Sequence, residues 1–191
     1  MIKKIIVLII VAAIAGTVGY RIGEQEPASV TDAGNTVIGT LLEKDYAKLE
    51  TLVSKDGLTL DFYPRMVDTN TIVKKDISNI ATDSKTRIWG YTDGKGDPVD
   101  LTTKDFLEKF IITRDYRTAP EIAVNKELGG GSNSISHIIK DAGDKRTIVA
   151  YYFKGFDPKY GGMDWTTMYL VFDKEGKEYK LRAIAKDNWT I

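Results

Sequence analysis

Residues 167–172 constrain the fold of this chain more than any other stretch of its sequence. They are β-branched, aromatic or large aliphatic, a composition that favours a strand over a helix. Alternation along a strand gives two faces, which carry Met168, Leu170 and Phe172, and Thr167, Tyr169 and Val171. Because both faces are apolar, we expect this strand to be central in its sheet. The alternative is a strand with helices packed on one face and partial cover on the other.

A returning strand follows after a turn at residues 173–176, where Gly176 provides the positive φ of a type I turn with a bulge. The residues after this turn form two alternating sets, which are Tyr179, Leu181, Ala183 and Ala185, and Lys180, Arg182, Ile184 and Lys186. This period of two predicts a strand with one face in the core and the other face half solvated. The two strands together predict a long antiparallel hairpin that ends at residues 189–191.

The rest of the pattern predicts an α+β domain. Apolar stripes that follow capping residues predict helices at about residues 32–42, 46–53 and 104–112, although Gly34 and Gly39 weaken the first. Strands are predicted at residues 58–63, 86–92, 99–101, 121–124 and 146–153. Residues 75–80 favour a short helix, and residues 134–139 fit either a strand or a helix.

The first 22 residues have the pattern of a signal peptide or a membrane anchor. Lys3 and Lys4 precede an uncharged run at residues 5–20, which contains a small-x-small cleavage pattern. An uncut helix over this run would extend roughly 24 Å, short of a hydrocarbon core of about 30 Å, so cleavage and anchoring both stay open, with a buried core helix a third and less favoured alternative. We expect residues 23–30 to form a linker and residues 31–191 to form a single extracytoplasmic domain, membrane-anchored or secreted.

Composition excludes several classes of function. Lys and Arg together number 27, as do Asp and Glu, so no basic excess predicts a nucleic-acid partner. The chain has no cysteine, which excludes disulfides, thiolate nucleophiles and thiolate metal sites. With His137 as the single histidine, zinc and Ser-His-Asp chemistry are improbable. We therefore predict no catalytic triad, no metal site and no cofactor.

Aromatic residues with neighbouring carboxylates suggest a ligand site. The candidate ligand-binding residues are Trp89, Tyr91, Asp93, Asp164, Trp165 and Trp189. Such a set can stack a flat or sugar-like ligand and accept its hydrogen bonds. The alternative is that the aromatic residues form core and the carboxylates cap turns, which is the more common role of aromatics in strands. A further alternative pairs Asp93 with Asp164 for glycoside hydrolysis, which depends on their separation in space.

The order of several short motifs resembles a family of exported bacterial proteins and lipoproteins of uncharacterised function. These motifs, over about residues 45–191, are Trp89-Gly90, Asp93-Gly94, Gly96-Asp97-Pro98, Met163-Asp164-Trp165 and Trp189-Thr190-Ile191. The chain lacks the lipid-bearing cysteine of the lipoproteins, which puts its mode of anchoring in doubt. The helix pair, the further helix and the late strands also resemble the NTF2-like, cystatin-like architecture, in which a curved antiparallel sheet wraps around about three helices. This resemblance implies a fold and no particular function.

From these observations we expect an exported cell-envelope domain that acts as a non-enzymatic binding or interaction module. Its partner would be a small molecule, a glycan or an envelope protein, bound at the concave face of the sheet. The alternative is a carboxylate-dependent hydrolase that acts on an envelope glycan.

Overall fold

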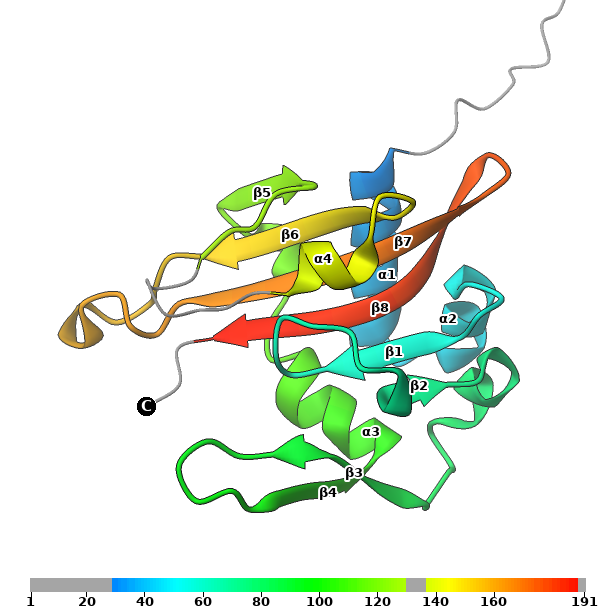
Figure 1. Ribbon diagram of the computed structural model, residues 1–191, viewed down its shortest axis with the longest axis horizontal. Helices are drawn as coiled ribbons and strands as arrows, with labels where there is room; N and C mark the ends of the chain where they lie inside the picture. Colours follow the sequence, from blue (N-terminus) through cyan, green and yellow to red (C-terminus); the bar gives the residue numbers. More distant parts are fainter. Residues whose placement is uncertain (1–28, 130–136, 189–191) are drawn as a thin grey trace, which may run out of the picture.

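The hairpin of β7 (Thr166–Glu175) and β8 (Glu178–Asn188) forms the middle of the main sheet (Figure 1). This sheet has the strand order β2-β1-β8-β7-β6-β5, while β3 and β4 form a separate hairpin. The computed structural model describes residues 29–129 and 137–188. The antiparallel hairpin predicted from the sequence is confirmed, and the described chain is an α+β domain.

The other elements have the following bounds. The strands are β1 (Leu58–Asp61), β2 (Thr71–Ile72), β3 (Thr86–Tyr91), β4 (Pro98–Thr102), β5 (Glu121–Val124) and β6 (Thr147–Phe153). The α-helices are α1 (Val30–Leu42), α2 (Tyr46–Leu52), α3 (Thr103–Phe106) and α4 (Ile138–Ala142). Shorter helical segments are η1 (Asp68–Asn70), η2 (Lys74–Asn79), η3 (Leu107–Ile111), η4 (Tyr116–Thr118) and η5 (Pro158–Tyr160), of which η3 is π-helical and the others are 3₁₀.

The sheet is mixed, so the prediction of an antiparallel sheet is wrong at one pair of strands. β1 runs parallel to β8, with Leu60 opposite Ile184. The chain enters β1 from the helix pair α1 and α2 and not from a tight hairpin, so no short turn forces the antiparallel direction. The remaining pairs of the main sheet are antiparallel.

Both faces of β7 are buried, as its sequence predicted. Met168, Leu170 and Phe172 belong to a large apolar cluster that α1, α2 and α3 also line, on what we call the inner face of the sheet. Tyr169 and Val171 belong to a second cluster with residues of α4, on the outer face. α1 and α4 accordingly lie on opposite sides of the sheet (Figure 1).

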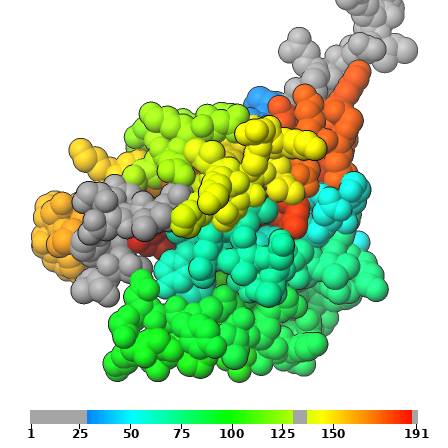
Figure 2. Space-filling model, in the orientation of Figure 1, coloured from blue at the N-terminus to red at the C-terminus, as the bar shows by residue number. Residues whose placement is uncertain are grey.

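The predicted sidedness of β8 is wrong. The register shifts between Val171 and Phe172 of β7, so that Val171 pairs with Ala183 and Phe172 with Leu181, leaving Arg182 as the extra residue of a bulge. Leu181 therefore faces the inner cluster while Ala183 faces the outer one. Neither face is half solvated, because the helix-lined cluster packs on the inner face and residues of α4, which stands at the surface in Figure 2, pack on the outer face.

Local signals explain where the helices begin. Ser29 caps α1 through a capping box with Asp32, so the helix begins at Val30, two residues before the start predicted at about residue 32. Asp45 caps α2 and Thr102 caps α3. The helix predicted at residues 104–112 begins as α3 and continues as the π-helical η3, where the Ile112 N–H bonds to the Leu107 carbonyl at 2.8 Å.

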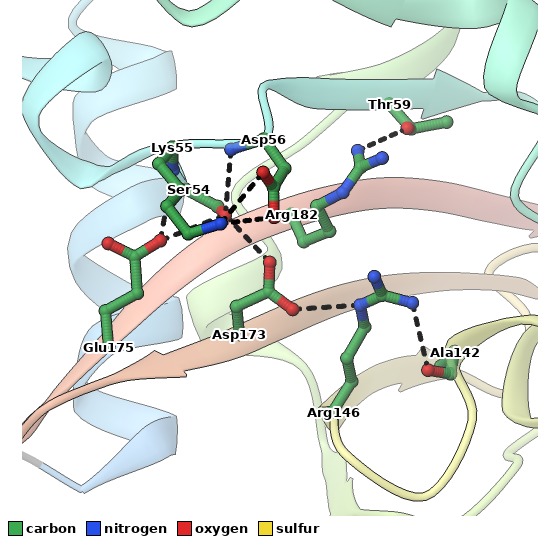
Figure 3. A network of polar contacts seen from close by, with 9 residues as sticks. All are labelled: Ser54, Lys55, Asp56, Thr59, Ala142, Arg146, Asp173, Glu175 and Arg182. Carbon is green, nitrogen blue, oxygen red and sulfur yellow. Dashed lines mark hydrogen bonds and ion pairs between the residues drawn. The ribbon is translucent and has the colours of Figure 1, made fainter.

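A polar network ties the segment before β1 to β6, β7 and α4 (Figure 3). Asp173 accepts hydrogen bonds from Arg146 Nε at 2.9 Å and from Ser54 Oγ at 2.7 Å, and Arg146 also reaches the Ala142 carbonyl. The Ser54 hydroxyl lies 3.1 Å from Glu175 as well. Because these groups bond to one another, we interpret the network as structural.

The predicted export segment at residues 1–22 lies outside the described residues, as do most of the linker and residues 189–191. In the described part of the chain, no helix has the length and apolar character needed to span a membrane.

Candidate functional site

Trp89, the first of the predicted site residues, is part of the core. Its ring stacks on Phe106 of α3 with centroids 4.1 Å apart, and its indole N–H donates to the Leu101 carbonyl at 3.0 Å. Only 2% of Trp89 is exposed. The residue therefore holds the β3–β4 hairpin against α3, and this stacked face is not free for a ligand.

Tyr91 and Asp93 lie at the turn between β3 and β4. Tyr91 is 58% exposed. Asp93 is exposed too, and it accepts a hydrogen bond from the hydroxyl of Tyr63 at 2.9 Å. The turn is thus tied to the segment that follows β1.

Asp164 organises the connection between β6 and β7. Its Oδ2 accepts hydrogen bonds from the backbone N–H groups of Phe156 and Asp157, at 2.9 and 2.8 Å. Burial raises the pKa of Asp164, but these two bonds and the positive charge of Arg114 outweigh it, so the pKa lies below its ordinary value. The other carboxylate oxygen, Oδ1, is buried with no hydrogen-bond partner among the described residues.

Trp165 is also largely buried, at the start of β7. Its ring centroid lies 6.3 Å from that of Tyr152, and Gly129 lies close against its ring. The described residues therefore do not gather the predicted set into one pocket, since Trp89 packs on α3 and Trp165 packs beside β6. Trp189 lies outside the described residues.

A buried polar cluster that the sequence analysis missed lies at one end of the inner face. Lys186 of β8 is completely buried, and its Nζ donates hydrogen bonds to Thr166 Oγ1 at 2.7 Å and to the hydroxyl of Tyr116. The Thr166 hydroxyl donates in turn to Asn188. We call Lys186, Tyr116, Thr166 and Asn188 the Lys186 cluster.

The surroundings of Lys186 disfavour its charged form. Burial lowers the pKa of Lys186 well below its ordinary value, and the positive charge of Arg114 lowers it further, against a weaker opposing effect of Asp187. A lysine in such a place can supply a neutral amine, which is why buried lysines with lowered pKa values recur at functional sites.

The positive charge of Arg114 acts on two of these groups, since it lowers the pKa of Asp164 and the pKa of Lys186. Its guanidinium carbon lies 3.6 Å from the ring centroid of Phe156 and 5.2 Å from that of Phe153. Its Nε is buried without a hydrogen-bond partner among the described residues, and Arg114 forms no ion pair with any of them. The half-buried guanidinium is therefore a cation without an ion-pair partner in the described chain, and its Nε donor has no hydrogen-bond partner there.

The sequence placed Lys186 on a solvated face because the bulge at Arg182 cannot be read from a period of two. Arg114 carried no signal either, since nothing local distinguishes it from other surface arginines. The one sequence signal that could have indicated the buried cluster was Lys186, a charged residue at the end of a long β-prone run.

A second titratable group lies at the end of β1. Asp61 is completely buried, and burial raises its pKa to about 6, although the Tyr63 backbone N–H and Arg65 lower it in part. Arg65 Nε lies 3.3 Å from Asp61 Oδ2, and Tyr63 connects Asp61 to Asp93. In the part of the chain that the structure describes, no three His, Asp or Glu side chains are placed to hold a metal ion.

Comparison with known proteins adds no assignment to these sites. No protein-family model matches the chain, and no curated protein is significantly similar to it.

Proposed function

We propose that this chain is an exported cell-envelope domain that binds, without catalysing a reaction, a small sugar-like ligand that carries a carboxylate. The ligand site would lie beside Arg114, between Asp164 and the Lys186 cluster. The observation that carries the proposal is a pair of buried polar atoms, since the Arg114 Nε donor and the Asp164 Oδ1 acceptor both lack partners among the described residues. Buried polar atoms without partners are rare in folded proteins, and a ligand that pairs with them is a direct explanation.

The chemistry of these groups specifies the ligand. The guanidinium of Arg114 suits a carboxylate, which it can bind through two parallel hydrogen bonds. The ionised carboxylate of Asp164 accepts hydrogen bonds and donates none, and its lowered pKa favours that state, so it suits a ligand hydroxyl as the donor. The rings of Phe153 and Phe156, of which Phe156 is 46% exposed, offer an apolar wall for the body of a sugar.

The proposal also covers the fold family and the cellular location of the protein. We infer an NTF2-like arrangement, which the helix pair before β1, the helices on the inner face and the antiparallel run of β5 to β8 support. The charge pattern of residues 1–22 supports export. Replacing Ile9 and Ile10 with Lys should leave the protein in the cytoplasm, because each Lys costs about 2.5 to 3.5 kcal/mol at the centre of an inserted segment. Normal export of that variant would contradict the location.

The ligand class can be tested by calorimetric titration of the full chain. The panel pairs glucuronic acid and N-acetylmuramic acid with glucose and N-acetylglucosamine, which lack the carboxylate. We expect binding of the acids only, and loss of that binding in Arg114→Gln. Arg87→Gln is the matched control, because Arg87 also lies over an aromatic ring, 5.1 Å from Trp89, in another part of the domain. Equal binding by the Arg114 and Arg87 variants would refute the site, and no binding of either acid would refute the ligand class.

A carboxylate-dependent hydrolase is the second candidate, and the pKa of about 6 at Asp61 favours it. A general acid in glycoside hydrolysis needs a carboxyl group that stays protonated near neutral pH. If this candidate is right, the full chain releases reducing sugar from a cell-wall glycan and Asp61→Asn does not. Absence of release by the unmodified chain would reject it.

A further inference from the structure

The geometry points to a second ligand site, at the C-terminal end of α1. We propose that this site binds a free apolar α-amino acid such as leucine. A pocket of about 270 Å³ lies between the end of α1, the start of α2 and η3. The residues that line it are Leu41, Leu42, Lys44, Tyr46, Leu107, Glu108 and Ile112. Its walls are thus mostly aliphatic, with one cation and one anion among them.

The two charges form an ion pair at the pocket. Lys44 Nζ lies 2.8 Å from Glu108 Oε1, and their side chains are 56% and 41% exposed. A pair as exposed as this contributes little to stability, so each partner can exchange the other for a ligand group. An α-amino acid presents both required groups on one carbon atom, because its ammonium can bind Glu108 while its carboxylate binds Lys44.

The backbone at the pocket is irregular on both sides. Lys44 has a φ of 56°, one of two non-glycine residues with a positive φ in the described chain. Across the pocket, η3 is a π-helical turn, a form that is rare and frequent at functional sites. The positive φ of Lys44 ends α1, because the backbone N–H groups of Lys44 and Asp45 bond back to the carbonyls of Leu41 and Thr40. Here the two irregular segments carry Lys44 and Glu108, so they set the positions of both charges.

The volume limits the ligand to a small molecule. At about 270 Å³ the pocket is just below the ~300 to 1,000 Å³ of typical small-molecule sites. The aliphatic side chains of Leu41, Leu42 and Ile112 suit a branched aliphatic group. A ligand with a single charge would leave either Lys44 or Glu108 without its partner, which predicts discrimination in favour of the zwitterion.

The test is calorimetric titration of the full chain with L-leucine and with two analogues that each lack one charged group. These are 4-methylpentanoate, which lacks the ammonium, and 3-methylbutylamine, which lacks the carboxylate. We expect L-leucine to bind about two- to fivefold more tightly than either analogue, because an exposed ion pair contributes roughly that factor.

Three variants locate the binding. Glu108→Gln keeps the shape of the pocket and should weaken L-leucine binding by about two- to fivefold, and Leu42→Trp should abolish binding by filling the pocket. Asp56→Asn is the matched control, because it removes one charge from the exposed Lys55–Asp56 ion pair elsewhere on the surface and should leave binding unchanged. Absence of L-leucine binding by the unmodified chain, equal binding of an analogue, or unchanged binding in Glu108→Gln would each overturn the proposal.

Discussion

Lys186 donates a hydrogen bond to the hydroxyl of Tyr116, 70 residues earlier in the chain, in the interior of the domain. This contact joins the end of β8 to η4, which follows the third helix. Lys186 also lies 4.2 Å from the centroid of the Tyr116 ring. The interior at this point is polar, although the cluster around it is otherwise apolar, and the polar side chains of Lys186, Tyr116 and Thr166 hydrogen-bond to one another there.

Lys186→Met should change how stability depends on pH. The pKa of Lys186 is lowered in the folded state, so an unfolded chain holds a proton that the folded chain lacks at any pH between that pKa and 10.5. Stability of the unmodified protein should therefore rise with pH in this window and fall as pH drops, by at most about 1.4 kcal/mol per unit. Methionine, of similar length and without the amine, removes this slope. Urea denaturation across the window measures it, and parallel curves for both proteins would show that Lys186 titrates as an ordinary lysine.

Asp61→Asn should stabilise the protein near neutral pH. The pKa of Asp61 rises from 3.8 to about 6 on folding, so the folded state carries a penalty that is absent below pH 3.8 and grows until pH passes 6. The difference of about 2 pKa units corresponds to about 3 kcal/mol as an upper value. Unfolding curves at pH 3.5 and pH 7 for both proteins check the sign. A variant that is less stable than the unmodified protein at pH 7 would mean that the ion pair with Arg65 outweighs burial.

Gly34→Ala should destabilise α1, against the usual preference of helices for alanine. A methyl group at Gly34 would overlap the hydroxyl of Tyr151 on β6, and close packing there leaves the ring little room. Overpacking of this kind costs about 1 to 3 kcal/mol, more than the helix gains from replacing glycine by alanine. Tyr151→Phe removes the overlapping hydroxyl, so the double variant should recover most of the loss. Thermal unfolding of the two single variants and the double variant measures it, and no recovery would place the cause elsewhere.

Local sequence pattern predicted those parts of the fold that depend on residues within a single helix or strand. The two apolar faces of residues 167–172 identified β7, and apolar stripes that follow capping residues identified α2 and α3. Gly34 made the prediction of the first helix less firm. The structure explains this glycine, because Tyr151 packs where a side chain at position 34 would lie. The parallel pairing of β1 with β8 could not be predicted, because no local signal records which distant strand becomes a neighbour.

The candidate site was harder to predict for the same reason. A bulge at Arg182 exchanges the faces of β8 and takes Lys186 into the interior, and a bulge leaves no reliable mark in a period of two. Aromatic residues were the visible signal, yet Trp89 serves packing. Asp164 was named correctly as a turn cap in one alternative, but the burial of its second oxygen without a partner could not be read from the sequence.

The most direct test of the proposed ligand site is the NMR signal of the Arg114 Nε–H group, assigned by its loss in Arg114→Lys. Without ligand, this buried donor has no hydrogen-bond partner among the described residues. The account predicts that N-acetylmuramic acid or glucuronic acid shifts this signal and slows its exchange with solvent, while the Nε–H of Arg87 stays unchanged. A ligand that binds the full chain with no change at Arg114, or that shifts Arg87 equally, contradicts the account.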